Sequence, residues 1–337
     1  MKKTVKVASL VLISVFVLVS LMGCSKKENA SVSTETTTKT AKPTKKYDLI
    51  MGTAGTSGTY YVVGAAMGAS VNKNSDKVNV IVQPTKGSIE NLNLANTDDI
   101  QLGFSNSDGV YWAATGTGNY AKTGKLKIQA VMNLYRSQGQ MVALKNSGIK
   151  TFGDLKGKKV NLGPSGQTVV EISKTVLRAY GIDPEKDITP LYLAVDEGLS
   201  KLKDGEIDAS FFSAAYPAAG VVNIASTTDI RLVDIDDEIL KKICADNPFY
   251  SYGIIPANTY NGQIEDCRVV EMITELFASS AAPEDAIYEF VKQALETQPQ
   301  YVTAHVSIKE ITPQFASQCV TELHPGALKY YKEKGLR

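Results

Sequence analysis

The chain has 337 residues, 43% of them hydrophobic and 21% charged, with 36 Lys and Arg against 35 Asp and Glu. This is enough material for one large or two medium domains, and it excludes collagen-like, low-complexity and supercharged chains. Residues 1–46 hold nine of the basic and two of the acidic residues, so residues 47–337 carry a net charge of −6, which argues against a nucleic-acid partner because phosphates require a basic face.

Residues 1–23 have the layout of a bacterial secretory signal peptide. Three lysines precede an uncharged apolar run over residues 7–23, and the small Gly23 stands before Cys24. A permanent transmembrane helix is the alternative, but 17 residues lie at the short end of what spans ~30 Å of hydrocarbon. The segment Leu21–Cys24 resembles a lipobox. This resemblance implies that Cys24 is lipidated and anchors the mature protein to the bacterial cell membrane, outside the cytoplasm.

The segment that follows the signal peptide predicts no folded structure. Residues 25–46 contain almost no large apolar side chain, so they cannot offset the entropy cost of ordering a chain. We therefore interpret residues 24–46 as the lipidated cysteine and a flexible tether, with the folded body beginning near Tyr47.

The body alternates strand-like apolar runs with helical patterns, which predicts βαβ units and largely parallel sheets. The sequence segments Asp99–Ser105 and Glu206–Ser213 are similar to each other. This repetition favours two lobes with related folds. Beyond Tyr260 the pattern predicts helices, so the chain is expected to return to its first lobe. The predicted fold is α/β and two-lobed, with a ligand cleft between the lobes and a helical C-terminal part. Residues 47–135 and 253–337 form lobe I, and residues 136–252 form lobe II. The predicted strands span 49–51, 78–83, 100–105, 128–134, 141–144, 159–162, 191–193, 209–213 and 231–235, and the predicted C-terminal helices span 265–280, 283–296 and 327–332.

Four loops with polar helix starts carry the functional prediction. Gly52–Tyr61 follows a strand and contains three spaced glycines, Pro84–Ser88 and Asn106–Asp108 follow two other strands, and Gly163–Thr168 follows a fourth. Free amides and the helix dipole at such starts favour an anionic group, and glycines allow close approach of the backbone. Loops beyond the carboxyl ends of parallel strands line one crevice, so these loops are expected to face a common cleft. A tight strand-to-helix turn without a ligand is the alternative for each loop taken singly.

Several candidate residues have a structural alternative. Thr168 begins a capping box that Glu171 completes, and this cap would occupy its hydroxyl. Tyr216 and Tyr135 could each lay a ring against a ligand or pack as ordinary edge residues. Arg136 could pair a carboxylate or stand as a solvated hinge charge.

The cysteines allow two interpretations. Outside the cytoplasm, Cys244 and Cys267 could form a disulfide and leave Cys319 buried and free. Three buried thiols are the alternative. No ligand spacing of cysteine or histidine predicts a metal site.

The chain offers little for catalysis. His305 and His324, the two histidines, lie in the helical ending, which places them away from the cleft loops in this prediction. The sequence lacks the G-x-S-x-G and H-E-x-x-H patterns of serine hydrolases and zinc peptidases. We therefore expect no enzyme, no metal and no cofactor.

Six sequence motifs lie in order along the body: GTAGTSGTYY, PTKGSIENL, FSNSDGVY, DLKGKKVNLGPSG, FFSAAYP and HPGALKYYKEKG. Taken together, they resemble the TAXI-type solute receptors of tripartite (TRAP) transporters over nearly all of residues 47–337. The resemblance implies an extracytoplasmic protein with a periplasmic-binding-protein-like fold. Its two lobes would close on a small anionic solute, a dicarboxylate or an amino acid such as glutamate or 2-oxoglutarate, and deliver it to a membrane permease. The binding protein of an ABC importer or a sensor is the alternative, and a secreted enzyme is a weaker one. The ligand-binding residues expected from the resemblance and the loops are Ser57, Gly58, Thr59, Tyr60, Ser88, Asn106, Tyr135, Ser165, Gln167, Thr168 and Tyr216.

Overall fold

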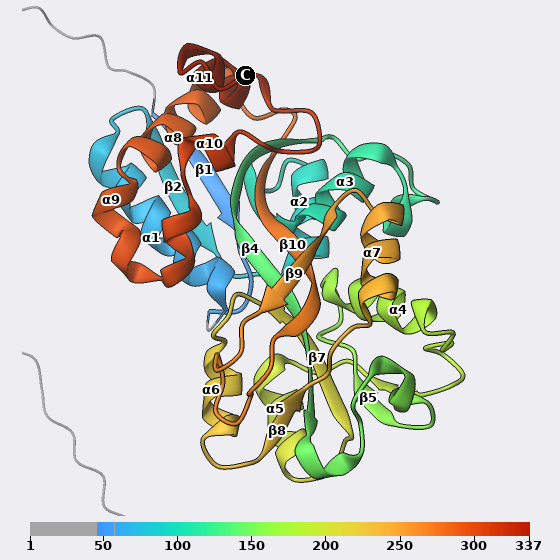
Figure 1. Ribbon diagram of the computed structural model, residues 1–337. Coiled ribbons are helices and arrows are strands. Elements are labelled where there is room, and N and C mark those ends of the chain that lie inside the picture. Colours follow the sequence, from blue (N-terminus) through green and yellow to red (C-terminus); the bar gives the residue numbers. More distant parts are fainter. Residues whose placement is uncertain (1–45, 57) are drawn as a thin grey trace, which may run out of the picture. The chain divides into compact units, whose positions relative to one another are not determined.

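In the computed structural model of the chain, which describes residues 46–337 except 57, ten strands form one sheet (Figure 1). The strand order is β2-β1-β3-β10-β4-β7-β5-β6, with β8 paired to β4 and β9 paired to β10. The strands are β1 (Tyr47–Gly52), β2 (Val78–Gln83), β3 (Leu102–Asn106), β4 (Ile128–Leu144), β5 (Lys159–Asn161), β6 (Thr189–Leu191), β7 (Ala209–Ala214), β8 (Ile230–Leu232), β9 (Tyr250–Ile255) and β10 (Cys267–Ser279). In the described part of the chain, no helix combines the length and the hydropathy needed to cross a membrane.

Two groups of parallel strands flank an antiparallel centre. β1 pairs in parallel with β2 and β3, and we call these strands and their covering helices the β1–β3 half. β5 pairs in parallel with β6 and β7, and these form the β5–β7 half. The long strand β4 joins the halves, because it pairs with β10 along its first part and with β7 along its last part. The two halves therefore share one hydrogen-bonded sheet.

Helices cover both faces of this sheet. In the β1–β3 half, α1, α8 and α11 pack on one core cluster, and α2 and α3 pack on another. In the β5–β7 half, α4 and α7 cover one cluster, and α5 and α6 cover the other. The helices are α1 (Thr59–Asn74), α2 (Ser88–Asn96), α3 (Ser107–Thr115), α4 (Val169–Ala179), α5 (Val195–Lys203), α6 (Ala219–Ala225), α7 (Asp237–Asp246), α8 (Glu284–Glu296), α9 (Gln298–Tyr301), α10 (Pro313–Ala316) and α11 (Pro325–Glu333).

Small residues allow α1 to lie close to the sheet. A Cβ on Gly64 would stand 2.8 Å from Thr53 Cγ2, and one on Gly68 would stand 3.1 Å from side-chain atoms of β2. A larger residue at Gly64 would push the helix outward. The glycines in this helix thus set the position of its N-terminus above the ends of β1 and β3.

The strand and helix predictions are confirmed in most of the chain, with two corrections. The predicted strand 78–83 and helix 283–296 are found at those places, whereas the two strands predicted at 128–134 and 141–144 are one continuous β4. The helix predicted over 265–280 is wrong, because residues 267–279 form β10. This strand lies in the middle of the sheet between other strands, and burial on both faces removes the alternation that marks a strand in a sequence.

The antiparallel centre is a further correction to the expected parallel arrangement, since β4 and β10 pair antiparallel with each other and with their other neighbours. The lobe boundaries at 135/136 and 252/253 remain a prediction. Both fall inside strands, the first in β4 and the second in β9. The signal peptide, Cys24 and the tether up to residue 45 lie outside the described residues.

The three described cysteines are free thiols, so the Cys244–Cys267 disulfide is not formed. The physical reason is their placement in different cores: Cys244 packs against the cluster under α4 and α7, and Cys267 belongs to the cluster under α5 and α6. Cys319 is buried in the core of the β1–β3 half. Burial raises the pKa of the Cys267 thiol to about 12, which keeps it protonated and unreactive.

Candidate functional site

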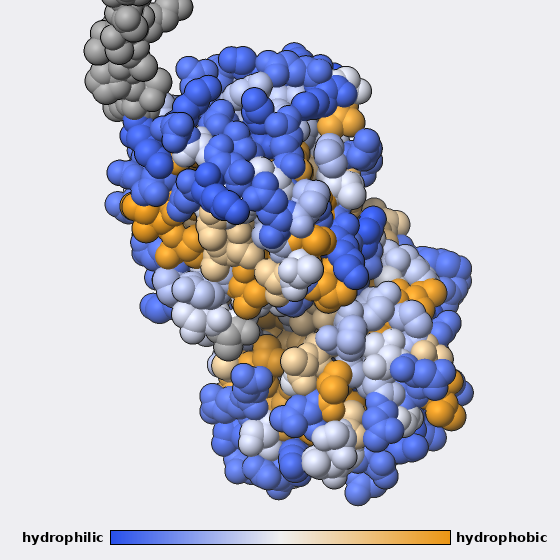
Figure 2. Space-filling model, turned by 90° about the vertical axis from the view of Figure 1, so that its left-hand side faces the viewer, coloured by the Kyte–Doolittle hydropathy of each residue, from blue (hydrophilic) through white to orange (hydrophobic). Residues whose placement is uncertain are grey.

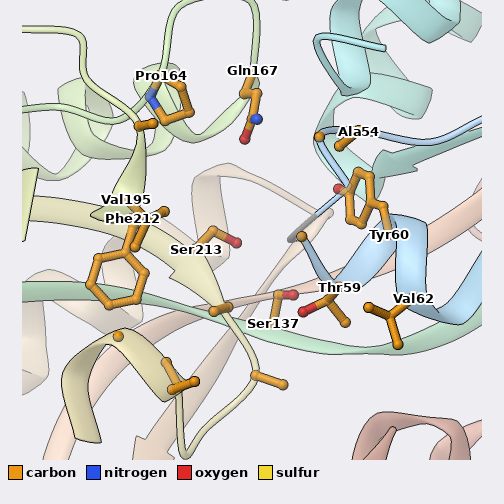
Figure 3. A pocket seen from close by; sticks show the side chains of 18 of the residues that line it. Ala54, Thr59, Tyr60, Val62, Ser137, Pro164, Gln167, Val195, Phe212 and Ser213 are labelled. Carbon is orange, nitrogen blue, oxygen red and sulfur yellow. The ribbon is translucent and has the colours of Figure 1, made fainter. Parts of the chain in front are cut away.

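A pocket of about 550 Å³ lies between the β1–β3 half and the β5–β7 half. In Figure 3 its wall is built from the loop before α1 on one side, from β7 and α5 on the other, and from β4 below. Thr59, Ser137 and Ser213 direct their hydroxyl oxygens, and Gln167 its side-chain amide, toward the space between these elements. The lining residues are Ala54, Gly55, Gly58, Thr59, Tyr60, Val62, Asn106, Tyr135, Ser137, Pro164, Gln167, Ala194, Val195, Asp196, Phe212, Ser213, Ala214, Ala215, Pro217, Ala218, Ala219, Gly220 and His305.

The loop between β1 and α1 is held by a buried amide. Asn91 is completely buried, and its Nδ2 donates to the carbonyl oxygens of Thr53 at 2.7 Å and Phe104 at 2.9 Å. The Thr85 hydroxyl donates to Asn91 Oδ1 at 2.7 Å. These bonds tie the ends of β1 and β3 to α2, so Asn91 is a positioning residue for the pocket wall. The spacing of motifs in the sequence did not single it out.

Three helix starts meet the pocket. The residues before α1, α5 and α6 are Gly58, Ala194 and Ala218, and all three line the wall. The first N–H groups of a helix have no partner inside the helix, and the helix dipole makes this end positive. No acidic side chain lies in the first turn of α1, whereas Asp196 in the first turn of α5 lines the same wall.

Polar contacts cross from one half to the other beside the pocket. Asn106, at the end of β3, donates from Nδ2 to Thr168 Oγ1 at 3.2 Å, and the Ile89 N–H donates to the Gly166 carbonyl at 3.3 Å. The expected capping box at α4 is not formed, since Thr168 makes no side-chain cap. Its hydroxyl instead serves a contact between two elements that are far apart in sequence. We regard this contact as a latch between the halves.

Asp108, in the first turn of α3, lies next to this latch. It is fully buried, and its carboxylate accepts from the Gly109 N–H at 2.7 Å and from the Tyr250 hydroxyl at 3.2 Å. Burial raises the pKa of Asp108 to about 6, although hydrogen bonds from Gly109, Thr168 and Tyr250 oppose the rise. A buried carboxylate that keeps several donors can remain ionised near neutral pH.

A second buried acid, Glu275 on β10, is less well satisfied. It is 1% exposed, and its Oε2 has no hydrogen-bond partner among the described residues. Burial and the nearby Asp108 raise the pKa of Glu275 to about 8. Asn133, its neighbour across the strand pair, also has both side-chain polar atoms unpaired within the described residues. Glu275 is therefore mostly protonated at pH 7.

The structure brings six of the predicted site residues together on the pocket wall: Gly58, Thr59, Tyr60, Asn106, Tyr135 and Gln167. Ser88 and Thr168 are buried behind the wall, where the Ser88 hydroxyl lies 3.4 Å from the Tyr60 hydroxyl.

Besides Ser88 and Thr168, two further predicted residues do not line the pocket. Ser165 is exposed, and Tyr216 packs against the core under α5 and α6. The neighbour of Tyr216, Pro217, lines the pocket instead, after a cis peptide bond. Ser57 lies outside the described residues.

His305 is the main residue that the sequence analysis misplaced. It was expected away from the cleft, but the C-terminal segment brings it to the pocket wall. Its Nδ1 accepts from the Ser307 N–H at 3.1 Å, which leaves Nε2 to carry the proton in the neutral ring. Burial lowers the pKa of His305. No motif signals this placement, because it depends on the return of the chain to the β1–β3 half.

Arg136 pairs with carboxylates of the protein. Its Nη1 lies 2.9 Å from Glu310 Oε2, and its Nε lies 3.3 Å from Glu271 Oε1. Its guanidinium also stands over the Phe315 ring, 4.7 Å from the ring centre. The sequence allowed Arg136 either to pair with a carboxylate or to be a solvated charge. The structure supports pairing, and the carboxylates belong to Glu271 and Glu310 of the protein itself. Among residues 46–337 without 57, no cluster of His, Cys, Asp and Glu is suited to hold a metal ion.

A family model matches most of the sequence, and solved structures of other proteins are similar in fold. The sequence model of the NMT1-like family matches residues 51–335. The fold is similar to that of the periplasmic aliphatic sulphonate binding protein SsuA of Escherichia coli, at 15% identity and a TM-score of 0.47, covering 86% of this chain and 84% of that one. The structure of CAE31940 from Bordetella bronchiseptica RB50 is also similar, at 15% identity and a TM-score of 0.53. The match covers 86% of this chain and 82% of that one. The α/β class predicted from the sequence is confirmed by the sheet and by the helices that cover both of its faces.

Proposed function

The chain belongs to the NMT1-like family, and from this premise we propose that it is the extracytoplasmic solute receptor of a TRAP-type transporter of the TAXI class. It captures a small carboxylate and delivers it to a membrane permease, without converting it chemically. The resemblance implies glutamate and 2-oxoglutarate as the first candidates. The observation that supports this proposal most directly is the pocket of about 550 Å³ between the two halves, with three helix starts on its wall.

The affinity of such a receptor requires more than the helix dipoles. A micromolar dissociation constant corresponds to about −8 kcal/mol, and each helix start contributes ~0.3–1 kcal/mol. Hydrogen bonds to a charged group contribute ~1.5–3 kcal/mol each. The hydroxyls of Thr59, Ser137 and Ser213, which point into the pocket, and the main-chain amides at the helix starts supply donors of this kind. Several of them must act together on one carboxylate.

Closure of the two halves on the solute would complete the site and could be the signal that the permease recognises. The Asn106–Thr168 hydrogen bond and the main-chain bond from Ile89 to Gly166 hold the halves together beside the pocket. A solute that bridges the halves adds to these contacts, so binding and closure stabilise one another.

We also propose that Cys24 carries the lipid anchor that keeps the receptor at the outer face of the cell membrane. One acyl chain holds a protein only marginally, and stable anchoring takes two or more. Replacing Cys24 by Ala should release the protein from the membrane fraction, and a Cys24→Ala protein that still sediments with membranes would contradict the anchor.

Native mass spectrometry of the freshly purified full chain tests the solute proposal. We expect a retained small molecule, and calorimetry with that molecule should give a one-to-one complex and recover all of it unchanged. Conversion of the molecule by the purified protein would indicate an enzyme. Purification from membranes together with the permease tests the transporter class, because an ATP-binding subunit in the complex would contradict the TRAP assignment.

A further inference from the structure

Residues 302–310 bring the C-terminal part of the chain to the pocket. They form two short 3₁₀-helices that meet at His305. The first of these helices contacts α1, and the second contacts β4. Thr59 on α1 and Ser137 on β4 point their hydroxyl oxygens into the pocket (Figure 3), and His305 lines the same pocket. The segment therefore places an imidazole ring beside the two elements that carry these hydroxyls.

Three contacts hold this segment in place. Ile308 is completely buried in the core of the β1–β3 half, and its carbonyl oxygen accepts from Gln298 Nε2 at 2.8 Å. The Glu310 carboxylate accepts from Arg136 Nη1 at 2.9 Å and from the Arg136 N–H at 3.3 Å. These contacts fix the backbone that follows His305, so the imidazole ring has a defined place at the pocket.

The ring of His305 has one nitrogen that is occupied and one that is open. Its Nδ1 accepts from the Ser307 N–H at 3.1 Å, so in the neutral ring Nε2 carries the proton. Nε2 forms no hydrogen bond to any residue that the structure describes, and it is not one of the buried polar atoms that lack a partner. The Nε2–H of His305 is therefore accessible to solvent, whereas the hydroxyl of Tyr135 is buried.

The other histidine uses both of its ring nitrogens within the fold. His324 is 2% exposed, its Nδ1 accepts from the Gly326 N–H at 3.2 Å, and its Nε2 lies 3.1 Å from the Ala282 carbonyl oxygen. In both histidines the N–H two residues further along the chain fixes the tautomer. Only His324 has an acceptor for its Nε2–H within residues 46–337 without 57. The donor of His305 is thus left for a molecule other than the described chain.

His305 is a neutral donor at pH 7.5. Burial lowers the pKa of its ring, and the Ser307 N–H acts in the same direction because it bonds to Nδ1 of the neutral form. No lysine or arginine lines the pocket in the described part of the chain, and the acidic side chain on its wall is Asp196. An anionic solute in this pocket must therefore be bound by neutral donors.

The surroundings of the segment are apolar. Figure 2 looks onto the side of the molecule where α1 and α9 lie in Figure 1, and hydrophobic residues gather across its middle. Val62 of α1 lines the pocket, and Val306, the neighbour of His305, is 56% exposed. A hydrogen bond made beside apolar groups is stronger than one made in water, so a single donor at this place contributes measurably to solute binding.

Resting on the proposed function, we infer that His305 is a solute-binding residue that donates a hydrogen bond from Nε2–H to an oxygen of the solute carboxylate. The main-chain N–H of Ser307 fixes the tautomer that makes this possible. The C-terminal part of the chain then belongs to the binding site as well as to the core of the β1–β3 half. A bound carboxylate joins this segment to the hydroxyls on α1 and β4.

Nuclear magnetic resonance of the full chain with nitrogen-15 histidine tests the contact directly, because the chain has two histidines. At pH 7.5 we expect 2-oxoglutarate to shift the Nε2 signal of His305, with the Nε2–H tautomer retained, and to leave the signals of His324 in place. If calorimetry shows that the acid binds and the Nε2 signal of His305 does not move, the inference is wrong while the proposed function stands. If neither 2-oxoglutarate nor glutamate binds, both fail.

Two substitutions at this one position separate the donor from the packing of the ring. His305→Gln and His305→Leu both remove the acceptor of the Ser307 N–H, but Gln keeps a side-chain N–H donor. We expect Leu to weaken 2-oxoglutarate binding about tenfold and Gln to weaken it about threefold or less. Urea denaturation should give the two variants similar midpoints, which makes them a matched pair. Equal affinities of the two variants would overturn the role assigned to His305.

Discussion

Replacing Glu275 by Gln is expected to stabilise the protein at and above neutral pH. Glu275 is 1% exposed, and its Oε2 has no partner within the described residues. Burial, with a contribution from Asp108, raises its pKa from 4.5 to about 8. In the unfolded chain the same group ionises at its ordinary value. Between these two pH values the folded protein therefore holds a proton that the unfolded chain has released.

The sign and size of the effect follow from this difference. The stability that the raised pKa of Glu275 contributes is complete below pH 4.5 and is lost as pH rises toward about 8. The loss is about 1.4 kcal/mol for each pH unit. The pKa values of His305 and His324 are lowered from the ordinary histidine value of 6.5. Above pH 6.5 both histidines are therefore mainly neutral in the folded and in the unfolded protein, and they add little to the pH dependence of stability. Asp108, with its pKa at about 6, is then largely ionised. From pH 6.5 to 8 the protein should lose about 2 kcal/mol of unfolding free energy through Glu275.

Urea denaturation measures this loss. Trp112 is the only tryptophan in the chain, and its ring packs edge-on against that of Phe249, with 5.4 Å between the ring centres. Its fluorescence therefore reports unfolding. The Glu275→Gln protein should show an unfolding free energy that is nearly constant from pH 6.5 to 8. Gln in place of the exposed Glu265 is the control and should keep the slope of the natural protein. A natural protein whose stability is flat over this range, or a Glu275→Gln protein with an unchanged slope, would refute the reasoning.

Three further substitutions separate solute binding from stability. Thr59→Val should weaken carboxylate binding about tenfold in calorimetry yet change the unfolding free energy by less than about 0.5 kcal/mol, since its hydroxyl points into the pocket; unchanged affinity would contradict this. Thr168→Val should cost about 1–3 kcal/mol in urea denaturation, because it leaves Asn106 Nδ2 without its acceptor, and a neutral result would show that the latch carries no energy. Gly103→Ala should cost about 1–3 kcal/mol and lower the Tm, since its Cβ would stand 2.5 Å from Phe277 Cζ; an unchanged Tm would mean that the ring moves freely.

The sequence by itself determined the features that depend on neighbouring residues. The α/β class, the strand at 78–83 and the polar starts of helices after strands all follow from local periodicity, glycines and chain direction. The loop residues Gly58, Thr59 and Tyr60 could be proposed for the site in this way, and they line the pocket. Such signals are local because hydrophobic period and backbone freedom act over a few residues.

Only the tertiary structure decided the long-range pairings. β10 is a strand because it lies between other strands, although its sequence read alone favours a helix. The Thr168 hydroxyl meets Asn106, 62 residues away, rather than capping its own helix, and His305 reaches the pocket from the C-terminal segment. Burial on both faces of a strand and the partner of a polar side chain depend on which distant segments meet, and no local pattern encodes that meeting.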